Sequence, residues 1–180
     1  MASPSEILAA VEDEAARTGR ILMEIWADGT QVDAEIFRAI EGRHDVVFIL
    51  QSVRALVRES LDMAVEYSRR LHGGIEAIAE RAERGDRNEA LVGIAQLVEG
   101  LEWLTGIYDR CRTFVTAPLR PGEETASRVE LLEAIDALLA RAGEGDLDGA
   151  ALSLRRDLAP RAASLALRVQ DLSRSRLDPQ

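Results

Sequence analysis

The chain contains no lysine, and all 22 of its basic residues are arginine. Schiff-base and pyridoxal phosphate enzymes use a lysine amine, and a P-loop needs a lysine beside the nucleotide phosphates. The sequence therefore excludes these classes. An arginine-only basic set is typical of G+C-rich coding, and we expect a bacterial source.

Cysteine is almost absent as well, since Cys111 is the single one. One cysteine allows no intramolecular disulfide, no CxxC redox pair and no multi-cysteine zinc site, which fits a reducing compartment. The N-terminal residues lack the basic and apolar regions of a secretion signal. No uninterrupted apolar run approaches the ~20 residues that cross a bilayer. We therefore expect a cytoplasmic protein with no membrane partner.

Aromatic residues make up only 4% of the 180 residues, whereas 47% are hydrophobic and 30% are charged. A chain of this length builds one sizeable core, and an aliphatic, alanine-rich core favours packed helices. The net charge of −10 repels phosphate backbones, and the arginines are spread along the chain beside acidic residues. We expect no nucleic acid partner.

Residues 1–51 predict a small α+β element. Ser3-Pro4-Ser5-Glu6 is a capping box, so a helix begins there and ends near Thr18-Gly19. Two short strands are predicted over 20–26 and 45–50, and the tight turn Asp28-Gly29 extends the first into a hairpin through 30–32. Asp33 caps a short helix that stops at Gly42.

Residues 52–180 predict a C-terminal four-helix bundle of two helical hairpins. The first helix has a heptad-like apolar seam from Val57 to Ala82, and Gly73-Gly74 within it predicts a kink or break. The fourth helix is expected to bend at Pro160. The segment 117–122 is rich in proline and joins the hairpins. The fold class is thus mainly α, with the element of 1–51 packed on the bundle as one compact unit.

Two similar turns join the helices of the two hairpins, at Gly85-Asp86 and at Gly145-Asp146. Each has an arginine five residues before the aspartate and an alanine four residues after it, so the two match at an offset of 60 residues. Glycine provides the left-handed end of one helix, and aspartate caps the next. The turn locally resembles the helix junction of tetratricopeptide repeats, but the 60-residue spacing departs from that family's 34-residue period. A true duplication and independent recurrence of a good turn both remain open.

Residue patterns for catalysis or metal binding are weak. Glu41-Gly-Arg-His44 matches the Glu-x-x-His spacing of di-metal bundles once, and it has no second copy. His72 is the only other histidine, Cys111 falls among core positions, and the acidic residues alternate with arginines as on solvated helix faces. The sequence predicts no catalytic residues, no cofactor and no metal site.

A glycine-marked face on the second long helix is the strongest candidate for binding. Gly93 and Gly100 are two turns apart, and two of the few aromatic residues, Trp103 and Tyr108, follow them. Such glycines allow close packing against another helix of the same chain or against a partner. These four residues are the predicted interaction face.

These observations favour a non-enzymatic protein-interaction or scaffold protein that forms a homo-oligomer, with an unidentified protein partner. A chaperone-like role is a narrower form of this hypothesis and rests on class analogy. The alternative is a metal-binding or small-molecule-binding helical-bundle enzyme that uses a pocket between helices.

Overall fold

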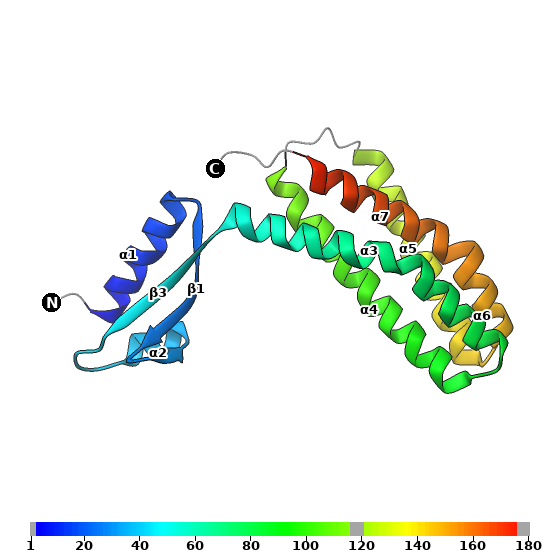
Figure 1. The fold of residues 1–180 in the computed structure, drawn as a ribbon, viewed down its shortest axis with the longest axis horizontal. Coiled ribbons are helices and arrows are strands. Elements are labelled where there is room, and N and C mark those ends of the chain that lie inside the picture. The colour runs from blue at the N-terminus through cyan, green and yellow to red at the C-terminus, as the bar shows by residue number, and fades with distance from the viewer. Residues whose placement is uncertain (1–2, 116–120, 176–180) are drawn as a thin grey trace. The chain divides into compact units, whose positions relative to one another are not determined.

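The computed structural model describes residues 3–115 and 121–175, without the side chains of 121–126. It is mainly α-helical, as predicted, with a small antiparallel sheet in its N-terminal part (Figure 1). The chain divides into two compact units, one ending at Arg58 and the other beginning at Glu59. The observed boundary between residues 58 and 59 comes seven residues after the expected boundary between 51 and 52. The first long helix follows the last strand without a break, so its first residues belong to the N-terminal unit.

The N-terminal unit contains a three-stranded sheet, where two short strands had been expected with a hairpin extension. Its strands are β1 (Arg20–Ala27), β2 (Thr30–Val32) and β3 (Val46–Ser52), arranged in the antiparallel order β2-β1-β3. Two helices accompany them, α1 (Pro4–Arg17) and α2 (Ala34–Ala39). The extension after the turn is therefore a strand in its own right.

Local sequence signals account for the elements of this unit. Ser3 and Glu6 form both hydrogen bonds of the capping box at the start of α1. Asp28 and Gly29 both have positive φ, at 49° and 79°, as a tight hairpin turn requires. Asp33 accepts a 2.7 Å hydrogen bond from the Ile36 N–H and so caps α2. All three predictions are confirmed.

One face of the sheet packs against the two helices. Leu8 of α1, Ile25 of β1 and Phe37 of α2 are buried together, and Phe48 of β3 meets Phe37 edge to face at 5.5 Å between ring centroids. Leu22, Val32 and Val46 complete this core. The sheet is therefore covered by helices on this face.

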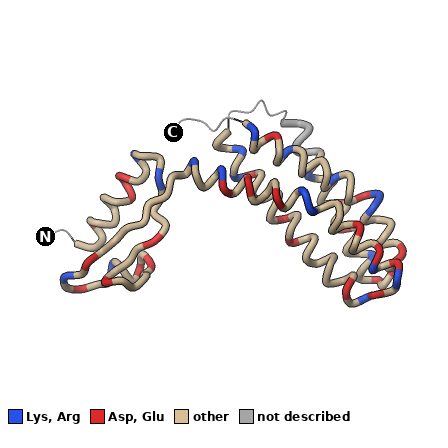
Figure 2. Tube along the Cα trace, in the orientation of Figure 1, with Lys and Arg blue, Asp and Glu red and all other residues tan. Residues whose placement is uncertain are grey.

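The C-terminal part consists of long helices joined in two hairpins. The first hairpin is α3 (Val53–Glu83) and α4 (Arg87–Cys111), and a short 3₁₀ turn, η1 (Arg112–Phe114), extends α4. The second is α5 (Pro121–Glu144) followed by α6 (Leu147–Ser153), the π-helical segment η2 (Leu154–Leu158) and α7 (Ala159–Arg174). Both acidic and basic residues occur along α3 and α7 (Figure 2). Buried aliphatic residues fill the space between them, including Leu101, Leu104, Leu138, Leu154 and Val169.

The turns at Gly85-Asp86 and Gly145-Asp146 have the same backbone structure. Gly85 and Gly145 have φ of 78° and 80°, and the N–H of each following aspartate bonds to the carbonyl five residues back, as in a Schellman motif. The capping side chains differ. Asp146 accepts from the Gly149 N–H as expected, whereas Asp86 makes no side-chain cap and lies 3.7 Å from Arg84 instead. The prediction that the aspartate caps the next helix is therefore confirmed for Asp146 and wrong for the Asp86 side chain.

Helix α3 is unbroken at Gly73-Gly74, so the break that was one of the two predicted outcomes does not occur. A Cβ at either glycine would meet no atom within 4 Å, so both lie on an open side of the helix. Leu71 and Ile75 pack on the buried side and hold the helix together. The interruption expected at Pro160 is confirmed, because the π-helical segment directly precedes α7 and Pro160 lies in the first turn of α7.

One helix of the described residues, Arg87–Phe114, is long and apolar enough by length and composition to cross a membrane. The apolar residues Ile94, Leu97, Leu101 and Leu104 of this helix are buried within the C-terminal unit. A helix in the core of a bundle has the same length and composition.

Proline-rich residues 117–120 of the expected linker lie outside the described residues. Helix α5 begins at Pro121, within the expected joining segment 117–122.

Candidate functional site

The two glycines of the predicted interaction face pack against α3 of the same chain. A Cβ at Gly93 would lie 2.9 Å from Ile78 Cγ1, and a Cβ at Gly100 would overlap the ring of Tyr67. Both glycines therefore allow α3 side chains to approach the α4 backbone. Close helix packing within the chain was one of the two roles predicted for them.

The two aromatic residues of the predicted face lie in different environments. Trp103 is partly exposed and meets Tyr67 edge to face at 5.6 Å between ring centroids. Tyr108 is buried and lines a cavity on another side of α4. The structure thus brings Gly93, Gly100 and Trp103 to the α3 side of the helix and separates Tyr108 from them.

The histidines do not gather metal ligands. His44 lies in the loop before β3, where its Nδ1 is 2.6 Å from Asp28 Oδ2 and its Nε2 is 2.9 Å from the Glu41 carbonyl oxygen. The hydrogen bond to Asp28 raises the pKa of His44 above its usual 6.5. In the described part of the chain, no three His, Cys, Asp or Glu side chains lie close enough to hold a metal ion.

A groove between α3 and α4 has a volume of about 420 Å³. Gly93 and Gly74 lie on opposite walls, Leu71, Ile78 and Leu97 provide apolar contacts, and Arg70 and Arg81 provide charge. Glu66 lies 3.8 Å from Arg70 and Glu89 lies 3.6 Å from Arg81, so both arginines have carboxylate partners. The groove is therefore an open cleft with its charge already balanced.

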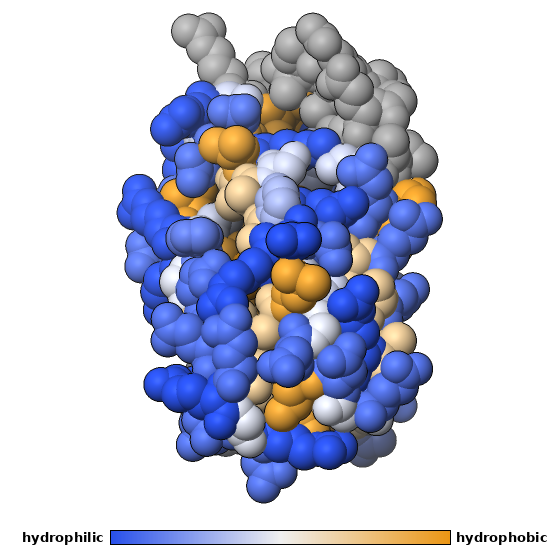
Figure 3. Space-filling model, turned by 90° about the vertical axis from the view of Figure 1, so that its right-hand side faces the viewer, coloured by the Kyte–Doolittle hydropathy of each residue, from blue (hydrophilic) through white to orange (hydrophobic). Residues whose placement is uncertain are grey.

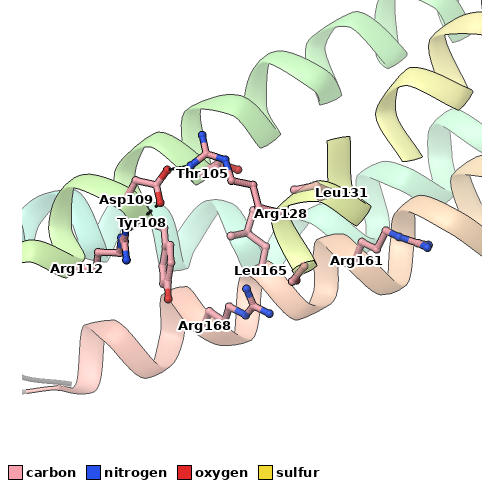
Figure 4. A pocket seen from close by; sticks show the side chains of 10 residues that line it. Thr105, Tyr108, Asp109, Arg112, Arg128, Leu131, Arg161, Leu165 and Arg168 are labelled. Atoms are coloured by element: carbon pink, nitrogen blue, oxygen red, sulfur yellow. Dashed lines mark hydrogen bonds and ion pairs between the residues drawn. The ribbon is translucent and has the colours of Figure 1, made fainter. Parts of the chain in front are cut away.

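A second cavity, of about 250 Å³, lies among α4, η1, α5 and α7 and is rich in arginine (Figure 4). In Figure 4, Tyr108 extends from α4 toward α7, which carries Arg168, while the guanidinium of Arg161 points away from the other arginines. Its lining comprises Thr105, Tyr108 and Asp109 of α4, Arg112 of η1, Ser127, Arg128 and Leu131 of α5, and Arg161, Leu165 and Arg168 of α7. Four arginines and one aspartate give these residues a net charge of +3, whereas the whole chain has −10.

The arginines of this cavity differ in how their charge is balanced. Asp109 is shared by two of them, with Arg128 Nη1 at 2.5 Å and Arg112 Nε at 3.6 Å from its carboxylate oxygens. Arg161 donates from Nη1 to the Asp157 carbonyl oxygen, and its Nε is buried without a partner. Among the described residues, no hydrogen bond or ion pair engages Arg168. Of the four arginines, Arg168 is therefore the one whose charge no described carboxylate balances and whose side chain makes no described hydrogen bond.

Sequence reasoning missed this cavity because its arginines are far apart along the chain. Each segment has a regular pattern of its own, since Arg161, Leu165 and Arg168 share one face of α7 and Tyr108 of α4 is four residues before Arg112 of η1. Arginines that are evenly spread along the sequence therefore gather around this cavity in the folded chain. Only the packing of three helices shows which faces meet.

The sheet of the N-terminal unit has an apolar face opposite its helices. Trp26 is paired with Val47 and Glu24 with Ile49, and directly paired residues of antiparallel strands lie on the same face. The exposed fraction is 55% for Val47 and 43% for Ile49. Ile21 and Met23 of β1 are exposed as well. We call Ile21, Met23, Trp26, Val47 and Ile49 the open sheet face.

The charged residue Glu24 lies beside the open sheet face, and its carboxylate is hydrogen-bonded to Trp26 of that face. Trp26 Nε1 donates a 2.7 Å hydrogen bond to Glu24 Oε2. Strand β3 itself has no charged residue, although charges precede and follow it (Figure 2). By contrast, the side of the molecule in Figure 3 is mostly hydrophilic with small, separate apolar patches. An exposed group of large apolar side chains commonly marks a surface that contacts another molecule.

Comparisons with known proteins find no matching family model, no matching curated protein and no matching solved structure, so they assign this chain to no family.

Proposed function

We propose that the chain is a non-enzymatic protein-interaction protein that forms a homodimer through the open sheet face. The single observation that carries this proposal is the exposure of Ile21, Met23, Val47 and Ile49 on one face of a sheet whose other face is packed. When two sheets stack face to face about 10 Å apart, they cover each other's apolar side chains.

A second copy of the chain is the occupant that the charge pattern favours. Two copies with a net charge of −10 repel each other over most of their surfaces. The five residues of the open sheet face are uncharged, and the neighbouring carboxylate of Glu24 is bonded to Trp26. A contact between two such faces therefore buries apolar side chains without bringing unpaired carboxylates of identical chains together.

Light scattering of the full-length chain over a range of concentrations tests this proposal. We expect a dimer, and we expect Val47→Glu to be monomeric because it would bury a charge at the centre of the contact. The dissociation constant should rise at least about a hundredfold. Circular dichroism checks that the variant keeps its helices.

The matched control is Leu167→Glu. Leu167 of α7 is 61% exposed and belongs to the other unit, so the same charge should leave the dimer intact. A monomeric wild-type chain, or a Val47→Glu variant that remains dimeric, contradicts the proposal. Loss of the dimer in both variants contradicts it as well, because charge alone would then be responsible.

A chaperone-like role is the narrower form of this proposal. In that case the open sheet face would cover an aggregation-prone segment of another protein instead of a second copy. Light scattering of an aggregating co-expressed subunit from the native host, with and without the chain, tests this role. If the Val47→Glu variant still protects the subunit from aggregation, the chaperone-like role belongs to a different surface.

A further inference from the structure

We propose that the arginine-lined cavity of the helical unit binds a small organic anion with a carboxylate or phosphate group, and that Arg168 is its main charge partner. The proposal is independent of the dimer, because every residue of the cavity belongs to α4, η1, α5 or α7. Nothing in the open sheet face contributes to it.

Charge balance is the first argument for an anion. Asp109 accounts for one of the four arginine charges in the lining, and both Arg112 and Arg128 lie beside it. Arg168 engages no carboxylate among the residues that the structure describes. A guanidinium without a carboxylate partner in a partly enclosed site is well suited to a carboxylate or phosphate, which it binds through two parallel N–H donors.

The local charge also outweighs the acidic character of the chain. Charges more than a Debye length away, about 8 Å at physiological salt, are largely screened. An anion in the cavity is therefore affected mainly by the arginines beside it, Arg168 above all, and much less by distant carboxylates.

The size and remaining lining of the cavity restrict the ligand. A volume of about 250 Å³ lies just below the range of about 300–1,000 Å³ for small-molecule sites, and it is too small for a folded protein segment. Leu131 and Leu165 provide an apolar surface, and Thr105, Tyr108 and Ser127 provide hydroxyl groups. The ligand is therefore a short molecule with an acidic group at one end and a small apolar part.

Thermal unfolding and calorimetry of the full-length chain with three probes test the proposal. The probes are inorganic phosphate, butanoate and the neutral amide of butanoate, all at equal ionic strength. We expect phosphate or butanoate to raise the melting temperature in a dose-dependent manner, and the amide to have no effect. The more effective of the two anions identifies whether the acidic group is a phosphate or a carboxylate.

Variants of two arginines on the same helix distinguish anion binding in the cavity from a general effect of salt on stability. Arg168→Gln should weaken anion binding about tenfold or more, and Arg168→Lys should recover part of it. Arg174→Gln is the matched control, because Arg174 lies on α7, is largely exposed and is outside the cavity. Equal stabilisation of the wild type and Arg168→Gln overturns the proposal. So does the absence of binding by both anions at about 10 mM, a concentration well above a millimolar dissociation constant.

Discussion

The ring of Tyr67 on α3 lies against the backbone of Gly100 on α4, in the space that a Cβ at that position would occupy. Tyr67 also meets Trp103 edge to face, so one tyrosine fills the gap between a glycine and a tryptophan of the neighbouring helix. Glycine costs about 1 kcal/mol relative to alanine within a helix. At Gly100 this cost is offset by the contact that Tyr67 makes.

Gly100→Ala should displace the Tyr67 ring toward solvent. Burial raises the pKa of Tyr67 above 10, so the displaced phenol should titrate at a lower pH than in the wild type. The near-ultraviolet circular dichroism of Trp103 should change as well. Stability should fall only slightly, because the gain in helix propensity opposes the lost aromatic contact of about 0.5–1.5 kcal/mol.

A double-mutant cycle makes this prediction sharper. In a Tyr67→Ala background the space beside Gly100 is empty, so Gly100→Ala should stabilise the chain by about 0.5–1 kcal/mol. Urea unfolding measures all four variants. If Gly100→Ala has the same effect with and without Tyr67, the two residues are not coupled and the close contact is not the reason for the glycine.

Gly73→Ala should stabilise the chain, by about 0.5–1 kcal/mol in urea unfolding. Gly73 lies within the unbroken helix α3, and a Cβ there meets no atom within 4 Å. The gain comes from the lower conformational entropy of alanine in the unfolded chain. A loss of stability would mean that α3 depends on glycine at this point, as the predicted kink implied.

Gly85→Ala and Gly145→Ala should both destabilise the chain, by about 1–2 kcal/mol each. Both glycines have φ near 80°, which costs an L-residue this amount of free energy, and both end a helix with the same hydrogen bonds. Asparagine at either position should cost less, because it tolerates the left-handed conformation. Thermal unfolding of the four single variants checks whether the two turns are energetically equivalent.

Stability should depend on pH through His44 and Asp28. The pKa of His44 is raised by its hydrogen bond to Asp28, so its contribution is fully present below pH 6.5 and is lost as the pH rises through the raised value. The pKa of Asp28 is lowered by its hydrogen bond to His44, so its contribution is present above pH 3.8 and is lost as the pH falls through the lowered value. The His44–Asp28 pair therefore stabilises the hairpin most between pH 3.8 and pH 6.5.

Asp28→Asn tests this pair without disturbing the turn. Asparagine tolerates the positive φ of residue 28 and still accepts the hydrogen bond from the Asp45 N–H. A nuclear magnetic resonance titration of the His44 imidazole should give a lower pKa in the variant than in the wild type. An unchanged His44 pKa would show that Asp28 is not the cause of the shift.

Arg155 should stabilise the contact between η2 and α3. Its Nε donates to Glu76 Oε2 at 2.8 Å, and its terminal nitrogens pair with Glu83. The hydrogen bond from Arg155 lowers the pKa of Glu83 from 4.5, so the contribution is present above pH 4.5 and is lost as the pH falls through the lowered value. Arg155→Gln should therefore lower the unfolding midpoint at neutral pH, and this difference should shrink in acid.

Arg69→Gln is the control for that variant. Arg69 and Glu66 form an exposed pair within α3, three residues apart, and such pairs contribute little. The unfolding midpoint of Arg69→Gln should match that of the wild type at neutral pH and in acid. An equal loss in the two variants would indicate that general charge balance, and not the contact between helices, determines the effect.

Sequence patterns predicted the elements whose causes are local. The capping box at Ser3, the hairpin turn at Asp28 and the interruption before Pro160 each depend on residues within one or two turns of each other. The same patterns failed where neighbouring residues compete. The Asp86 carboxylate lies beside Arg84 and does not cap its helix, and α3 continues as one helix through Gly73.

The candidate sites depend on contacts between distant segments, which local patterns do not contain. Gly93 and Gly100 were recognised as positions of close approach, but the sequence left open whether α3 or another protein approaches them. The arginines of the cavity were visible individually, and their separation along the chain concealed that they meet.

The sequence alone determined the absence of lysine chemistry and disulfides, the mainly helical class and the two glycine-aspartate turns, because each follows from composition or from residues close in the chain. The tertiary structure alone decided that Tyr67 fills the space at Gly100, that the sheet has an open apolar face and that Arg168 shares a cavity with Arg112 and Arg128. The physical reason is that helix and turn formation depend on near neighbours, whereas burial and charge balance depend on which faces pack together.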